Sequence, residues 1–329
     1  MPSWSEILAE LQQTQSQIGQ PPFDVVRRKY LALLNRNTKR NVILYATSWT
    51  QPRPIDPTFT SITDEDVQGF MEVVKGLKGD KLDLILHSPG GSGDAGAAIV
   101  SYLRSKFKDI RVIVPQAAMS AACMISCAGN TIVMGKHSSL GPIDPQMILK
   151  TQLGVRYVPA QAILDQFELA KKECQDPKKL GSWAPILVQY GPALLIESQN
   201  ALKSSESIVS NWLEAYMFAH LGSRKAKNLA KKTAKQLANH QYFKSHSYHI
   251  NREEARSFGL IIEDLEKKQK FQDLVLSVFH STTHTFDGTP AVKIIENHKG
   301  RAFIKAVRMV PPPAQSPSQP PQRPASPNP

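Results

Sequence analysis

The chain has 329 residues, and 40 Lys and Arg residues against 28 Asp and Glu residues give it a formal net charge of +12. Hydrophobic residues make up 41% of the sequence, which is enough for a substantial core and excludes a globally disordered chain. Three cysteines are too few for a disulfide framework, so a cytoplasmic location is expected.

The N-terminal segment predicts a helical arm over residues 1–40. Apolar residues recur at helical spacing over Trp4–Gln17, and Ser5 is a candidate N-cap. The segment lacks the basic stretch followed by an apolar stretch that a secretory signal requires. We therefore expect it to be part of the folded protein.

Strands and helices alternate through the middle of the chain. Short apolar runs predict strands over Asn41–Thr47, Leu82–His87, Ile110–Val114 and Thr131–Met134, and helical spacing predicts helices from Thr63 onward, over Gly96–Phe107 and over Ala117–Cys127. This alternation predicts an α/β fold with a parallel sheet and crossover helices, in which the apolar strands are buried on both faces. The uncharged segment Val112–Gly135 is long enough to cross a bilayer, but its proline, glycine and asparagine favour a strand, a turn and a helix.

The C-terminal half predicts additional helices. They cover Ala160–Cys174, Gly191–Gln199, Ser207–Ala219, Ala226–Ala238 and Arg252–Phe258. Residues 224–235 carry six cations and no acid, which is typical of a solvated helix face and also makes them a candidate for peripheral contact with an acidic membrane. Residues 311–329 are rich in proline and predict a disordered tail, which leaves one domain over residues 41–310.

A glycine-rich motif follows the second predicted strand. Ser88-Pro89-Gly90-Gly91-Ser92 lies where that strand ends, and ligands of parallel α/β sheets bind at the carboxyl ends of strands. Two adjacent glycines let the backbone present N–H groups to a ligand oxygen. Taken alone, the motif is also typical of an ordinary turn from a strand to a helix.

A single hydroxyl group stands among small residues in the segment that follows the next strand. Ser120 lies within Ala117-Ala118-Met119-Ser120-Ala121-Ala122, at the expected start of a helix. A helix N-terminus stabilises negative charge, so an oxyanion formed by attack of Ser120 could accept N–H bonds from Ala121 and Gly91. The alternative interpretation is that Ser120 is only an N-cap.

Together these motifs resemble a known family. The runs LILHSPGGSGDAGAAIVSYLR, IVPQAAMSAACMISCAG and MGKHSSLGPIDPQ are similar, in order and spacing, to the catalytic half of Clp-fold serine peptidases, and above all to the serine dehydrogenase proteinase family. That family is related to the Clp protease proteolytic subunit and to signal-peptide peptidases. The resemblance extends from about Asp24 to about Val307. Ala122 stands where the family usually has glycine.

The resemblance implies a function and a site. We expect a Clp/crotonase-like fold and a homo-oligomer that hydrolyses peptide or protein substrates through an acyl-serine intermediate. Ser120 is then the nucleophile, and the segment Gly90-Gly91 together with Ala121 forms the oxyanion hole. A catalytically silent Clp-fold binding or assembly protein is the second hypothesis. Acyl-CoA chemistry is less favoured, because no acidic pair accompanies the glycine-rich segments.

The general base has several candidates. The Clp proteolytic subunit has a histidine in the loop where this chain has Asp144, and signal-peptide peptidases have a lysine where this chain has Ala160 and Gln161. Our hypothesis is that His246 takes the Ser120 proton while Asp144 fixes its tautomer. Lys150, acting as a desolvated base, is the alternative, and His246 with a purely structural role is another.

No cofactor or metal is expected from the sequence. Cys123 and Cys127 share a helix face, but no further Cys or His lies at ligand spacing, so we predict core residues rather than zinc ligands. The glycine-rich run lacks the Lys-Ser/Thr ending of a phosphate-binding loop. Nucleic-acid binding is not favoured, because no aromatic platform accompanies the cations.

Overall fold

A seven-stranded sheet forms the centre of the computed structural model, which describes residues 3–151 and 154–307. In spatial order its strands are β10 (Ile262–Asp264), β5 (Thr131–Met134), β3 (Asp109–Val114), β2 (Lys81–His87), β1 (Asn41–Thr47), β11 (Ala291–Asn297) and β12 (Ala302–Ala306). The five strands from β10 to β1 are parallel, whereas β11 is antiparallel to both β1 and β12. The predicted α/β fold with a parallel sheet is confirmed.

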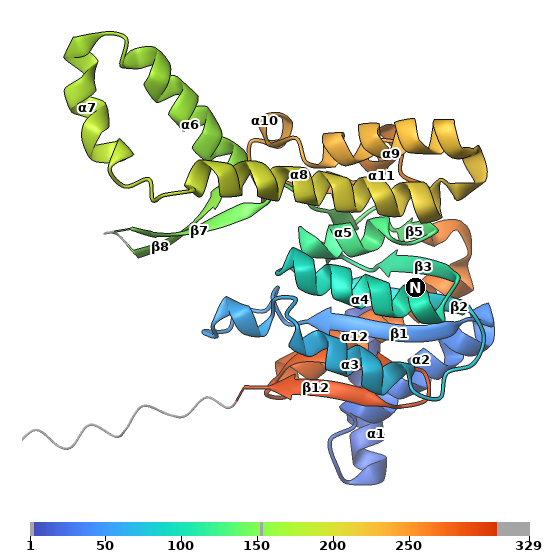
Figure 1. The fold of residues 1–329 in the computed structure, drawn as a ribbon. Helices are drawn as coiled ribbons and strands as arrows, with labels where there is room; N and C mark the ends of the chain where they lie inside the picture. The colour runs from blue at the N-terminus through green and yellow to red at the C-terminus, as the bar shows by residue number, and fades with distance from the viewer. Residues whose placement is uncertain (1–2, 152–153, 308–329) are drawn as a thin grey trace, which may run out of the picture.

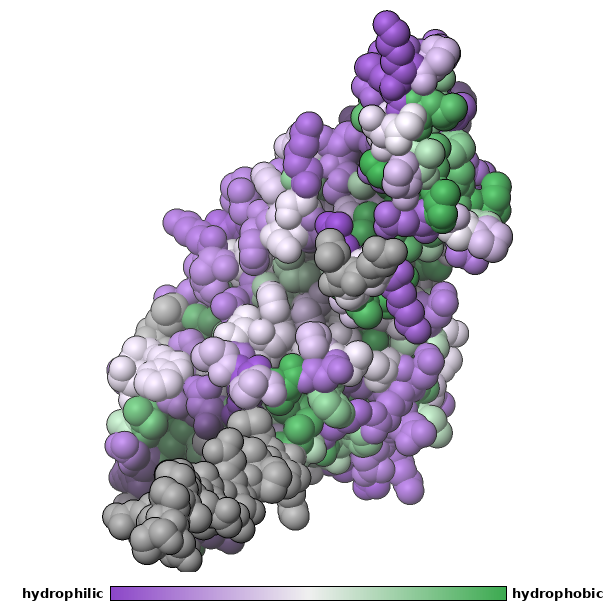
Figure 2. Space-filling model, turned by 90° about the vertical axis from the view of Figure 1, so that its left-hand side faces the viewer, coloured by the Kyte–Doolittle hydropathy of each residue, from purple (hydrophilic) through white to green (hydrophobic). Residues whose placement is uncertain are grey.

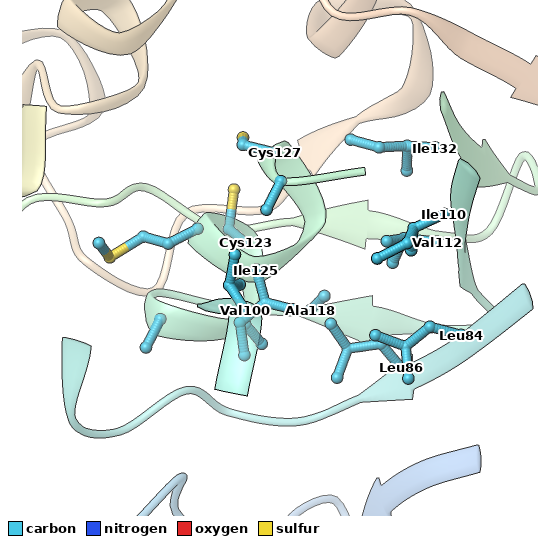
Figure 3. Close-up of a cluster of buried hydrophobic side chains, with 14 of the residues drawn as sticks. Leu84, Leu86, Val100, Ile110, Val112, Ala118, Cys123, Ile125, Cys127 and Ile132 are labelled. Atoms are coloured by element: carbon cyan, nitrogen blue, oxygen red, sulfur yellow. The ribbon is translucent and has the colours of Figure 1, made fainter. Parts of the chain in front are cut away.

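Helices cover both faces of this sheet (Figure 1). On one face lie α2 (Phe23–Thr38) and α12 (Gln269–Gly288), with α1 (Trp4–Ile18) packed outside them. On the other face lie α3 (Glu65–Val74), α4 (Gly93–Lys106) and α5 (Ala121–Cys127). Strand residues alternate between the two cores: Leu84 and Leu86 face α4 and α5, whereas Ile85 faces α12. Figure 3 shows the core between the sheet and helices α4 and α5, in which Val100 and Ile125 face the strands.

Short strands connect this core to the segments above it. β4 (Ala117–Ala118), β6 (Ser139–Leu140) and β9 (Ile250–Asn251) form a small sheet, and β7 (Gln146–Thr151) pairs with β8 (Gly154–Pro159) as a hairpin. α10 (His240–Phe243) and α11 (Arg252–Ser257) flank β9 in the sequence. The small sheet therefore brings together three segments: the one that leads into α5 through β4, the one that follows β5 through β6, and the one that follows α10 through β9.

A helical lobe projects from the body of the molecule (Figure 1). It contains α6 (Ala160–Glu173) and α7 (Pro177–Leu187), which are followed by the long α8 (Leu194–Trp212) and by α9 (Ser223–Leu237). Figure 2 shows hydrophobic side chains gathered on this lobe. The exposed apolar residues of this lobe and of the adjoining β7–β8 hairpin, which we call the apolar lobe surface, are Ile148, Val155, Tyr157, Leu169, Leu180, Ile186, Val188 and Ile196.

The N-terminal arm shares the core of the domain. Leu31 and Leu34 of α2 are fully buried against the sheet, so α2 covers one of its faces. The N-cap of α1 is Ser3, not the predicted Ser5, because the Ser3 hydroxyl accepts the Glu6 N–H at 3.2 Å in a capping box. The predicted tail over residues 311–329 lies outside the described residues.

Two further element predictions need correction. The helix predicted over Ala117–Cys127 is instead the short strand β4 followed by α5. The two helices predicted over Gly191–Gln199 and Ser207–Ala219 form the single helix α8, which ends in a π-turn over Leu213–Met217. The uncharged segment Val112–Gly135 does form a strand, a turn and a helix, as predicted.

Helix α9 has one exposed, positively charged face and one buried, apolar face. The cations of residues 224–235 are exposed, and the opposite face of α9 buries Ala226, Ala230 and Leu237. Within residues 3–151 and 154–307, no helix has the length and apolar character that a membrane span needs. Contact of α9 with an acidic membrane surface and a cytoplasmic location stay predictions.

Candidate active site

Ser120 lies in a sharp turn between β4 and α5. Its backbone has φ 50° and ψ −121°, a conformation that costs a non-glycine residue about 1–3 kcal/mol. Ser120 stands at the N-cap position of α5, but its side chain accepts no hydrogen bond from a backbone N–H of that helix, so capping is not the role of its hydroxyl. A strained turn from a strand to a helix is the geometry that exposes the nucleophilic serine of α/β-hydrolases.

The glycine-rich loop lies directly against this turn. A Cβ atom placed on Gly90 would be 2.7 Å from Ser120 Cβ and 3.0 Å from the Ala121 nitrogen. Gly90 and Gly91 have φ angles of 98° and 145°, which L side chains rarely adopt. Only residues without a side chain therefore let the two segments approach this closely.

Two backbone N–H groups are available at this point. Among the hydrogen bonds of the described residues, none uses the N–H of Gly91 or of Ala121. The Gly90 N–H, by contrast, donates to Ser88 Oγ at 3.2 Å. Gly91 and Ala121 are therefore the candidate oxyanion donors, whereas Gly90, whose N–H has a partner, contributes by allowing the close approach.

Residues 61–63 hold the glycine-rich loop in place. Ile62 N donates to the Gly90 carbonyl at 2.7 Å, and Ser92 N donates to the Ile62 carbonyl at 3.0 Å. A Cβ atom on Gly91 would be 2.4 Å from the Ile62 nitrogen. The position of the Gly91 N–H is thus fixed by the backbone of a neighbouring loop rather than by flexible side chains.

Asp144 and His246 come together as the hypothesis about the base requires. Asp144 is 1% exposed, and its Oδ1 lies 2.7 Å from His246 Nδ1. The backbone N–H of Ile143 donates to the Leu237 carbonyl at 3.0 Å, which fixes the loop of Asp144 to the end of α9. An imidazole that donates from Nδ1 to a carboxylate keeps Nε2 free to accept a proton.

His240 is a third member of this cluster that the sequence did not single out. Its Nδ1 lies 3.0 Å from Asp144 Oδ2, so one carboxylate contacts two imidazoles. Gln146 Nε2 also donates to Asp144 Oδ2, at 3.1 Å. His240 is separated from Asp144 by 96 positions, so no local pattern marks it among the nine histidines.

The Ser120 hydroxyl makes no hydrogen bond to any described residue, so the structure does not join it to His246. Hydrogen bonds to a catalytic base are often long in a free enzyme and tighten when substrate binds. The role of His246 as the base for Ser120 therefore stays a hypothesis.

Lys150, the alternative base, and His87, the histidine nearest in sequence to the glycine-rich motif, both have surroundings that do not suit a general base. Lys150 is exposed on β7, where it lines a cleft of about 910 Å³ between the hairpin and the helical lobe, so it is not desolvated. His87, which precedes the glycine-rich motif, packs its ring 5.0 Å from that of Phe279 on the α12 side of the sheet. Burial lowers the pKa of His87 to about 3, so it does not accept a proton at neutral pH.

The two cysteines of α5 belong to the core, as predicted. Cys123 and Cys127 are fully buried, and both are free thiols. A hydrogen bond with Cys123, together with burial, raises the pKa of the Cys127 thiol well above its usual value. Within the described ranges, no group of three or more His, Cys, Asp and Glu side chains is arranged to hold a metal ion.

Comparison with curated proteins finds relatives in Methanocaldococcus jannaschii. The uncharacterized protein MJ0137 is 30% identical over 208 residues, which are 63% of this chain and 62% of that protein. The uncharacterized protein MJ1495 is 29% identical over 187 residues, which are 56% of each chain. The chain therefore spans less than two thirds of the length of either relative.

Comparison with solved structures finds a mutant of the 1510-N membrane-bound stomatin-specific protease, at 13% identity and a TM-score of 0.36 over 65% of this chain and 79% of that one. A second mutant of the same protease, in complex with a substrate peptide, matches at 16% identity and a TM-score of 0.35 over 62% of this chain and 71% of that one.

The family comparison covers most of the chain. A family described as ClpP-like SDH-type serine proteinase matches residues 24–275, which include the Ser120 turn, the glycine-rich loop, Asp144 and both of its histidines. The chain belongs to the ClpP-like SDH-type serine proteinase family.

Proposed function

We propose that this protein is a serine peptidase that hydrolyses peptide bonds through an acyl-serine intermediate on Ser120. The observation that carries the proposal is the pair of unused N–H groups, on Gly91 and Ala121, beside the strained Ser120 turn. Preorganised donors of this kind stabilise the negative charge that develops on a carbonyl oxygen during acyl transfer.

The proposed reaction assigns one task to each group. Ser120 Oγ attacks the substrate carbonyl carbon and gives its proton to His246 Nε2, and the carbonyl oxygen becomes an oxyanion on the Gly91 and Ala121 N–H groups. Asp144 stabilises the imidazolium through Nδ1. The proton then passes to the leaving amine, and water, activated by the same imidazole, releases the acid and restores Ser120.

Turnover of an unfolded protein tests this proposal against the second hypothesis. We expect the purified protein to cleave unfolded casein or short peptides into fragments detectable by mass spectrometry. If the protein is folded and assembled but no fragment forms, the result favours a catalytically silent binding or assembly protein. The apolar lobe surface is the feature that would serve such a role, because exposed apolar patches mark sites of protein interaction.

The identity of the base can be tested by two substitutions. His246→Ala should lower kcat by about 10²–10⁴-fold, the usual contribution of a general base. Lys150→Ala should retain activity, because this lysine is exposed on the hairpin. A kcat that falls for Lys150→Ala and is unchanged for His246→Ala would assign the base to the lysine.

Gly91→Ala should lower kcat by about 10²–10³-fold, the usual cost of one oxyanion donor. The new Cβ atom would lie 2.4 Å from the Ile62 nitrogen, so the loop must shift and its N–H must leave its position. Gly93→Ala is the matched control, because the nearest atoms to its Cβ are 3.9 Å away in the Met124 side chain. Equal rates for the two variants in the peptide assay would remove Gly91 from the oxyanion hole.

A further inference from the structure

The Asp144 carboxylate accepts hydrogen bonds on both of its oxygen atoms. His246 Nδ1 lies 2.7 Å from Oδ1, and His240 Nδ1 lies 3.0 Å from Oδ2. The carboxylate is almost completely buried, so few water molecules can replace these partners. A buried carboxylate depends on the donors that the protein supplies.

Two donors fix the orientation of the carboxylate where a single donor would not. The torsion that rotates an aspartate carboxylate is broad, because it joins an sp³ carbon to an sp² carbon. A bond to His246 alone would let the group turn and tilt the imidazole with it. The bond from His240 to the second oxygen, together with the one from Gln146, opposes that rotation.

The position of His240 is itself well defined. It is the first residue of α10, whose cap is Asn239, with Oδ1 accepting the Tyr242 N–H at 3.1 Å. Lys244 N closes the short helix by donating to the His240 carbonyl at 2.7 Å. These hydrogen bonds at both ends of the turn fix the backbone of His240, and the chain continues from the turn to His246.

We propose that His240 is a positioning residue for the acyl-transfer reaction: it holds the Asp144 carboxylate in the orientation that keeps Oδ1 on His246. The inference rests on the proposed function, in which His246 is the base. His240 acts through Asp144. Together with Asp165, Gln241 and Lys244 it lines a cleft of about 520 Å³, which is not the cleft that Lys150 lines.

Three variants separate positioning from other roles. His240→Ala removes the donor, whereas His240→Asn keeps an N–H near the place of Nδ1. His249→Ala is the matched control, because His249 belongs to the same segment as His246 but contacts Ser139 Oγ, at 2.7 Å, rather than Asp144. We expect His240→Ala to lower kcat by about 10- to 100-fold with KM changed by less than about twofold, and His240→Asn to restore most of the rate.

A spectroscopic measurement tests the inference without any turnover. In ¹⁵N-histidine NMR spectra of the Ser120→Ala protein, His246 should be the Nδ1–H tautomer with a hydrogen-bonded proton. His240→Ala should broaden or remove that proton signal, and His240→Asn should retain it. An unchanged His246 signal and unchanged kcat in His240→Ala would overturn the proposal, as would an Nε2–H tautomer of either histidine in the Ser120→Ala protein with both histidines intact.

The outcomes also separate this inference from the proposed function. A kcat for His240→Ala as low as that for His246→Ala, without rescue by His240→Asn, would make His240 the base itself and overturn the positioning role. If the NMR signals change as expected but no variant and no unsubstituted protein cleaves peptide, the positioning of Asp144 stands and the proposed function fails.

Discussion

Replacing Ser120 by alanine should lower kcat for peptide hydrolysis by on the order of 10⁶-fold, because the acyl-serine route disappears with its nucleophile. Only the residual catalysis from substrate binding and the oxyanion donors should remain. The fold should be retained, since the Ser120 hydroxyl makes no hydrogen bond to any described residue, and the thermal midpoint should stay close to that of the unsubstituted protein.

The control for this prediction is Ser126→Ala. Ser126 lies on α5, the helix that begins directly after Ser120, and its hydroxyl donates to the Ala122 carbonyl at 2.9 Å. Its removal should leave kcat within a few fold. Equal rates for the Ser120 and Ser126 variants in the casein assay would show that the hydrolysis does not pass through Ser120.

The second large effect is on stability, at a buried ion pair between β11 and α3. Lys293 Nζ lies 2.6 Å from Asp66 Oδ1, and both side chains are 1% exposed. Asp66 Oδ2 also accepts from the Tyr45 hydroxyl and from the Thr63 N–H, each at 2.9 Å. Burial lowers the pKa of Lys293, and Asp66 opposes that shift.

Lys293→Met should destabilise the protein by about 3–5 kcal/mol, because it leaves the Asp66 carboxylate buried without its cation. The measurement is urea unfolding followed by circular dichroism. The double variant Asp66→Asn with Lys293→Met should recover part of the loss, because the uncompensated charge is then gone. Equal stability of Lys293→Met and the unsubstituted protein would contradict this account of the pair.

The same ion pair supports the candidate site. Lys293 Nζ donates to the Ser61 carbonyl at 2.8 Å, and Asp66 accepts from Thr63, so the pair fixes both residues that flank Ile62. Ile62 in turn holds the glycine-rich loop. A protein that has lost the pair should therefore also lose part of the proposed peptidase activity, even at temperatures where it is folded.

Elements whose apolar pattern is local could be predicted from the sequence. The bounds of β1 and β5 agree with the predicted strands, because each is an apolar run of full burial or nearly so that ends at polar or glycine residues. Ser120 and Gly91 could be singled out as candidates because two weak motifs agreed with a family pattern. The pairing of Asp144 with His246 was a hypothesis, and the structure places the two side chains in hydrogen-bond contact.

Elements that bury polar groups could not be predicted in the same way. β11 carries Lys293 and Glu296, which are charged in the sequence but fully buried in the structure, because Asp66 and Arg27 pair with them from distant helices. In α12, hydroxyl groups such as those of Thr282 and Thr285 donate to carbonyls of the preceding turn. These buried side chains are polar by residue type, so the buried face of α12 does not show as an apolar pattern in the sequence. The contact of His240 with Asp144 could not be predicted for the same reason, because the two residues are 96 positions apart in the chain.

Labelling with a serine-reactive phosphonate probe tests the central claim most directly, because the probe forms a bond only with an activated hydroxyl. After proteolysis of the labelled protein, mass spectrometry should place the phosphonate on Ser120, and His246→Ala should slow the labelling while Lys150→Ala should not. A protein that takes up no probe, or takes it up at another residue, would contradict the account of Ser120 as the nucleophile.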